Sequence, residues 1–185
     1  MPDMILLEAE EKMEHTIDAL HKEFSKVRTG RANPKILDSV KVDYYGSLTP
    51  ISQVGNISVP EPTQLLIKPF DRSIVVDVEK AINAANLGFN PQNEGTHIRI
   101  VLPALTTERR KELTKHVKKS GEEFKVFLRN VRREANDAIK KMEKASEISE
   151  DDSKGYLEDI QELTDNFTTK IDEVVKAKEE DIMSI

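Results

Sequence analysis

The sequence predicts an α+β protein in which a long three-helix bundle is interrupted by a small inserted β/α/β domain. Apolar residues recur every three or four positions over three long stretches, which is typical of amphipathic helices. Between the first and second stretches the pattern changes to short runs broken by proline and glycine, which is typical of strands and turns. With 37% apolar and 34% charged residues in 185, the chain can form one or two small cores with much charge on exposed helix faces.

The first long helix is expected over residues 5–28. Its apolar stripe comprises Leu6, Ala9, Met13, Ile17, Leu20, Phe24 and Val27. Because spacings of three and four place these side chains on one face, the helix must bury that face against a partner.

Residues 30–105 form the inserted domain. Short strands are expected at 36–45, where apolar and polar residues alternate, and at 64–70 and 96–101. Pro50, Gly55, Pro60 and Pro62 interrupt these runs and indicate turns. A short helix is expected over 73–86, ending at Gly88.

The second and third helices follow the inserted domain. The second is expected to begin at Thr106 or Thr107, which can cap a helix, and to continue to about residue 145, with possible local softening at Gly121, where glycine costs roughly 1 kcal/mol relative to alanine. The third opens at Ser149, followed by acids that suit the positive end of a helix, and its stripe reaches Val174. None of the three can bury its stripe alone, so they are expected to form a bundle.

The chain therefore divides into a bundle from 1–29 and 106–185 and an insertion of 30–105. Two short segments connect them, and such a pair is a natural hinge. Gly30 can adopt backbone angles that other residues avoid, and Pro34 and Pro103 stiffen the flanks. We expect rotation at Thr29, Gly30, Arg31, Ala104 and Leu105.

Catalytic and metal-binding patterns are absent from the sequence. There is no cysteine, which excludes disulfides, cysteine-ligated zinc and a thiol nucleophile. The four histidines form no HExxH pair, and no phosphate loop or GxSxG motif occurs. The first residues show neither a basic n-region nor an apolar h-region, so no signal peptide is expected, and no apolar run is long enough for a membrane span. We expect a cytoplasmic protein that is not an enzyme and needs no metal or cofactor.

The feature of the sequence that indicates a function is a basic face on the second helix. Residues 106–145 carry 13 Lys and Arg against 7 Asp and Glu, although the whole chain has a net charge of −6. At about 100° per residue one face collects Lys111, Lys115, Lys118, Lys125, Arg129, Arg132, Arg133 and Lys140. This face suits a phosphate backbone. It is equally compatible with a solvated face, or with pairing to the acidic third helix.

Five segments carry a resemblance to a known family. Residues 27–34, 43–46, 107–111, 130–137 and 147–152 resemble, in this order, the signature segments of the ribosome recycling factors, and the likeness extends over essentially the whole chain. The family fold is a three-helix bundle with a βαβ-type domain inserted after the first helix, in an L-shaped outline that mimics transfer RNA. Phe124 and Phe127 stand where smaller residues are common in the family, and Glu134 stands where aspartate is common.

The resemblance implies a function. Family members are monomers that bind the post-termination ribosome along large-subunit ribosomal RNA. Elongation factor G and GTP then drive a domain movement that separates the subunits and releases mRNA and deacylated tRNA. Arg129 and Arg132 match the family's RNA-contacting arginines, Arg133 and Arg110 are further candidates, and Arg28 and Arg31 flank the first hinge. Lys118 and Lys125 join this set from the basic face.

Two other functional classes remain open from the residues alone. A coiled-coil scaffold or general RNA chaperone would explain the helices but not the inserted domain. An enzyme would require a pocket that gathers scattered carboxylates.

Overall fold

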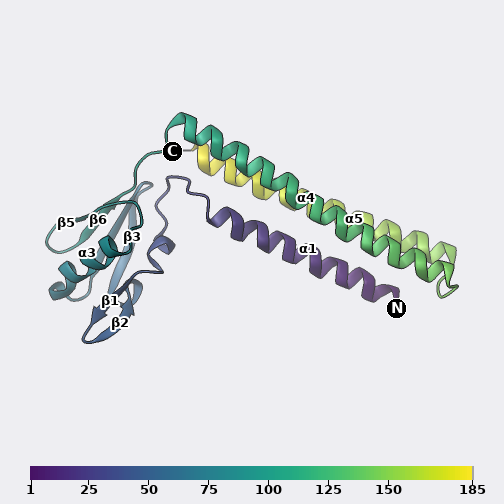
Figure 1. Cartoon of the computed structure of the whole chain (residues 1–185), viewed down its shortest axis with the longest axis horizontal. Coiled ribbons are helices and arrows are strands. Elements are labelled where there is room, and N and C mark those ends of the chain that lie inside the picture. Colours follow the sequence, from purple (N-terminus) through teal and green to yellow (C-terminus); the bar gives the residue numbers. More distant parts are fainter. Residues whose placement is uncertain (185) are drawn as a thin grey trace. The chain divides into compact units, whose positions relative to one another are not determined.

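The computed structural model describes residues 1–184 and consists of two compact units. The first, here called the bundle, comprises Met1–Arg28 and Thr107–Ser184, and the second, the inserted unit, comprises Thr29–Thr106. Figure 1 shows the long helices of the bundle and the small sheets of the inserted unit. This is the predicted α+β architecture.

The bundle is built from α1 (Pro2–Ser25), α4 (Thr107–Lys144) and α5 (Glu150–Met183). Each of these helices contacts the other two. α1 begins at the end of the bundle where α4 turns back into α5 (Figure 1), and there the Tyr156 hydroxyl donates to Asp3 at 2.6 Å. The buried apolar side chains are Ala9, Met13, Leu20, Phe24, Leu113, Val117, Leu128, Ala135, Ile139, Ile160, Phe167, Ile171 and Ile182.

The start of α5 is a capping box, as its sequence predicts. Ser149 Oγ accepts from the backbone N–H of Asp152 at 3.1 Å, and the Asp152 carboxylate accepts from the backbone N–H of Ser149 at 3.3 Å. These bonds satisfy amide groups that a helix start otherwise leaves without partners. α5 continues well beyond Val174, where the predicted stripe ended.

Gly121 lies where α4 and α5 approach closely. A Cβ atom at this position would meet Val175 Cγ2 at 2.6 Å, which is closer than real carbon atoms approach. α4 runs through Gly121 without a break. The glycine therefore has a packing role that its helix propensity alone does not indicate.

The inserted unit contains two antiparallel sheets. β1 (Lys41–Tyr44) pairs with β2 (Ser47–Pro50), and the second sheet has the order β3 (Gly55–Glu61), β4 (Gln64–Pro69), β6 (Ile98–Val101) and β5 (Pro91–Asn93). The helices are α2 (Ile51–Val54) and α3 (Val75–Ala84), with 3-10 turns at Pro34–Leu37 and Arg72–Ile74. Their core is separate from that of the bundle and includes Val42, Leu65, Ile67, Ile82, Ile98 and Ile100.

The predicted strand at 36–45 is wrong in its first half. Pro34–Leu37 is a 3-10 turn, because Asn33 accepts the backbone N–H of Lys35 at 3.0 Å and fixes a helical start. Only Lys41–Tyr44 is a strand. The predicted strands at 64–70 and 96–101 correspond to β4 and β6.

Two residues that indicate turns in the sequence lie inside a strand. Gly55 and Pro60 belong to β3, a strand that the sequence pattern does not predict. β3 is an edge strand, and its register with β4 shifts between Ser58 and Glu61. Proline is tolerated at such a place because no ladder hydrogen bond needs its missing N–H.

Candidate nucleic-acid interface on helix α4

The basic face of α4 divides into two groups of residues. Lys118, Lys125 and Arg132 contact polar side chains of α5. The other members are exposed, as Lys118 also is, but have no ion-pair partner within residues 1–184: Lys111, Lys115, Arg129, Arg133 and Lys140. The two groups therefore differ in how much positive charge they present to solvent.

Lys125 is tied to α5 by a short ion pair. Its Nζ lies 2.6 Å from Asp172 Oδ1 and 3.1 Å from Glu122 Oε1, and its side chain is 21% exposed. The hydrogen bond that the Lys125 ammonium donates to Asp172 raises the pKa of Lys125 above its ordinary value. Lys118 lies 3.7 Å from Glu179. Lys118 and Lys125 therefore pair with acids of α5, the third long helix, which is one of the alternatives that the sequence left open.

Arg132 is held differently. Its Nη1 donates to Gln161 Oε1 at 2.9 Å, and Gln161 Nε2 donates to Asp165 Oδ1 at 2.9 Å. The direct partner of the guanidinium is thus a neutral amide. Within residues 1–184 no carboxylate forms an ion pair with Arg132.

Arg129 and Arg133 are exposed on α4, and residues 1–184 supply neither with an ion-pair partner. They follow the i, i+3, i+4 spacing with Arg132 that places three side chains close together on one side of a helix. These three residues, which their spacing brings to one side of α4, are here called the arginine cluster.

The remaining candidate residues lie elsewhere. Arg110 is half-buried in the first turn of α4, and its Nε is buried without a partner. Arg28 ends the first segment of the bundle, and Arg31 lies near the start of the inserted unit. Both already take part in interactions within the protein.

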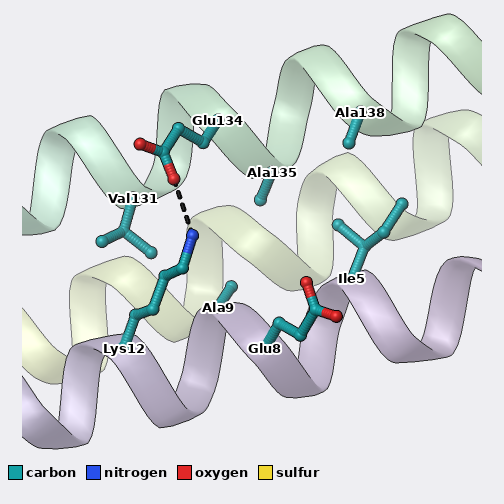
Figure 2. Close-up of a pocket in the computed structure, with 8 residues that line it drawn as sticks. All are labelled: Ile5, Glu8, Ala9, Lys12, Val131, Glu134, Ala135 and Ala138. Atoms are coloured by element: carbon teal, nitrogen blue, oxygen red, sulfur yellow. Dashed lines mark hydrogen bonds and ion pairs between the residues drawn. The ribbon is translucent and has the colours of Figure 1, made fainter.

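A shallow groove lies between α1 and α4, and Figure 2 shows its lining. Lys12 reaches across from α1 to Glu134 on α4 at 2.8 Å, and this hydrogen bond raises the pKa of Lys12. The groove, about 210 Å³, is otherwise lined by Glu8 and small or aliphatic side chains. Of its two carboxylates, that of Glu134 is engaged by Lys12.

The residues that the structure describes form neither a metal-binding group nor a membrane-spanning helix. Among residues 1–184 no three His, Asp or Glu side chains gather into a metal-binding group. None of the helices described there combines the length and apolar character of a membrane span.

Phe124 and Phe127 pack edge to face with ring centroids 5.7 Å apart. Phe127 is nevertheless 54% exposed. The larger residue at this position is therefore accommodated at the surface of α4 and does not crowd the core.

The residues that contact the basic face of α4, and that the sequence did not single out, lie on α5. Gln161, Asp165 and Asp172 hold Arg132 and Lys125 but carry no motif. The seven-residue spacing of Asp165, Asp172 and Glu179, which repeats that of the cations on α4, was the available signal.

Fold and surface together define a binding protein whose prominent feature is a cationic helix face on a three-helix bundle. Residues 20–183 match the family model described as Ribosome recycling factor, so the chain belongs to the ribosome recycling factor family. This is a family of non-enzymatic translation factors, as the sequence resemblance implied.

Relatives and solved structures agree along the full length. The ribosome-recycling factor of Bacillus cereus strain AH187 is 54% identical over 185 residues, and that of Brevibacillus brevis is 51% identical, each covering 100% of both chains. A solution structure of the ribosome recycling factor matches with a TM-score of 0.76 at 43% identity, covering 100% of this chain and 98% of that one.

A second solved structure contains a relative within a larger complex. It describes the T. thermophilus ribosome recycling factor and the E. coli elongation factor G bound to the E. coli post-termination complex. The recycling factor in it matches with a TM-score of 0.64 at 38% identity, covering 99% of each chain.

Proposed function

We propose that the protein acts with elongation factor G and GTP to separate post-termination ribosomes into subunits in the cytoplasm. Messenger RNA and deacylated tRNA then become available for a new round of translation. Support comes from membership of the recycling factor family over the full chain and from the relative seen with elongation factor G on a post-termination complex.

The bundle is proposed to bind large-subunit ribosomal RNA as a monomer through the outward side of α4. The observation that carries this proposal is the arginine cluster, whose three cations have no carboxylate partner within residues 1–184. Guanidinium groups make strong, often bidentate hydrogen bonds to phosphate. Lys118 and Lys125 contribute less, because carboxylates of α5 offset their charge.

Arg110, Arg28 and Arg31 are proposed as outlying RNA contacts. Movement of one unit relative to the other is proposed to occur at Thr29, Gly30, Arg31, Ala104 and Leu105. The φ angle of +80° at Gly30 supports this assignment, because side-chain-bearing residues rarely adopt it.

Sedimentation tests the recycling function directly. Post-termination ribosomes are incubated with the protein, elongation factor G and GTP and are then separated on a sucrose gradient. We expect conversion to subunits only when all three components are present. Ribosomes that remain intact with the complete mixture, while a Bacillus cereus recycling factor splits them, would contradict the proposal.

A further inference from the structure

Ion pairs between α4 and α5 follow a regular register. Lys118 pairs with Glu179, and Lys125 pairs with Asp172. From one ion pair to the next, the position on α4 increases by seven residues and the position on α5 decreases by seven, which is about two helical turns. The next step places Arg132 opposite Asp165, so a third direct cation–carboxylate pair is expected there.

At Arg132, the third position of this register, a direct ion pair is not formed within residues 1–184 and a glutamine is the partner. Gln161, one turn before Asp165 on α5, accepts from Arg132 Nη1 at 2.9 Å and donates to Asp165 at 2.9 Å. The bond to Asp165 fixes which end of the amide faces the arginine, because only the carbonyl oxygen can accept. The neutral Gln161 amide is thus inserted between the cation and the carboxylate.

This insertion changes what Arg132 presents to a ligand. A carboxylate partner would offset the guanidinium charge, as Asp172 does for Lys125. The amide instead holds the side chain in one orientation without adding a negative charge. The Nε of Arg132 is buried without a partner and one Nη1–H group is donated to Gln161, so the second Nη1–H and the two Nη2–H groups are the donors left for an incoming phosphate.

We infer that Gln161, oriented by Asp165, is a positioning residue that holds Arg132 in place and keeps its charge available for an RNA phosphate. The inference rests on the proposed function, since it requires Arg132 to contact RNA. An arginine already fixed in its bound orientation loses less conformational freedom on binding.

The decisive variant is Gln161→Glu, which keeps the shape and the accepting oxygen but adds a carboxylate beside Arg132. Binding to isolated large ribosomal subunits should weaken roughly tenfold, the scale of one charge-assisted hydrogen bond. The slope of log affinity against log salt should become shallower by about one phosphate contact. The new ion pair with Arg132 is opposed by the loss of the hydrogen bond to Asp165 and by repulsion between the two carboxylates, so the change in melting temperature should be small, and its measurement checks that the fold is retained.

Asn166→Asp is the matched control. It makes the same amide-to-acid change on an exposed position of α5, but about 140° around the helix from Gln161. It should have a much smaller effect on affinity. An equal loss in both variants would mean that added negative charge anywhere on α5 repels RNA, and the inference would be wrong.

Arg132→Ala separates this inference from the proposed function. In the Arg132→Ala background, Gln161→Glu should cause no further loss, because the arginine through which it acts is gone. If Arg132→Ala weakens binding but Gln161→Glu does not, positioning by Gln161 is refuted while RNA contact by Arg132 stands. If Arg132→Ala itself binds at the parental level, the assignment of Arg132 to RNA fails and the positioning role falls with it.

Discussion

Individual cations on α4 differ in the partner that each one faces. Lys125 contacts two carboxylates, Arg132 contacts an amide, and Arg129 is exposed to solvent. Buried or half-buried ion pairs act mainly between the two groups that form them, whereas an exposed arginine retains its donors for a ligand. Basic residues on one helix can therefore serve either packing against a neighbouring helix or binding of a ligand.

Substitution of Arg129 and Lys125 should separate these roles. Arg129→Ala should weaken large-subunit binding by about 1–3 kcal/mol, the cost of a lost charged hydrogen bond, and should leave the melting temperature unchanged. Lys125→Ala should lower the melting temperature, since Asp172 loses its partner, with less effect on binding. Lys176→Ala, which removes an exposed charge from α5, is the control for both. Equal binding losses for all three variants would indicate only a general charge effect.

Acid sensitivity should appear at Glu94 in the inserted unit. Its carboxylate accepts from Arg99 Nε at 2.9 Å and contacts His97, and these bonds lower the pKa of Glu94, Arg99 being the larger cause. The folded pKa is therefore below the unfolded one. The resulting stabilisation is present above the unfolded pKa and is lost as the pH falls through the folded pKa.

The measurement is urea unfolding of the parent and of Glu94→Gln between pH 7 and pH 3. The parent should be more stable at neutral pH, and the difference should shrink below the ordinary pKa of a glutamate. A constant difference across this range would show that the charge of Glu94 does not contribute. The side chain is partly exposed, so the effect should be modest and reduced by salt.

At the scale of elements, the contact between α4 and α5 depends on a missing side chain. Gly121→Ala would improve helix propensity by roughly 1 kcal/mol, yet its Cβ would overlap Val175. Overpacking of this kind costs about 1–3 kcal/mol, so we expect a lower melting temperature. Gly155→Ala is a matched control, because it lies within α5 with nothing inside 4 Å of the added atom, and it should raise the melting temperature.

The double variant Gly121→Ala, Val175→Ala checks the stated cause. Removing the Val175 methyl groups makes room for the new Cβ, so the double variant should melt higher than the additive sum of the single effects. Strict additivity would place the cost of Gly121→Ala elsewhere than at Val175.

The long helices were predictable because their apolar periodicity is local and extends over many turns. The buried Ile139 lies outside the apolar series that the sequence predicts for the second helix, because the face that α4 turns to α1 and α5 depends on both neighbours; that series is Leu113, Val117, Phe124, Leu128, Val131, Ala135, Ala138, Met142 and Ala145. β3 escaped prediction because pairing with β4 overrides the local signals of Gly55 and Pro60. The cations of the site were visible in the sequence. Their partners were not, because the register between α4 and α5 is a tertiary property.

At the scale of the whole molecule, two compact units are joined by two chain connections, one at Arg28–Thr29 and one at Thr106–Thr107. Their hydrophobic cores are built from separate sets of residues. Each unit can therefore keep its internal structure while the connections change their backbone angles. In the proposed function one unit holds RNA while a GTPase displaces the other, and this mechanism would require such independence.

Rotation of one unit relative to the other can be measured directly. The chain has no cysteine, so paired cysteines can be placed at will and spin-labelled for distance measurements. A pair at Asn93 in the inserted unit and Lys170 in the bundle should give a broad distance distribution, because both sites are exposed and lie in different units. A pair at Glu14 and Lys170, both within the bundle, should give a narrow one. A narrow distribution for the first pair as well would contradict rotation at the connections.

Replacement of Gly30, whose φ is +80°, with valine should shift the distance distribution of the Asn93 and Lys170 pair. It should also slow subunit splitting while leaving large-subunit binding nearly unchanged.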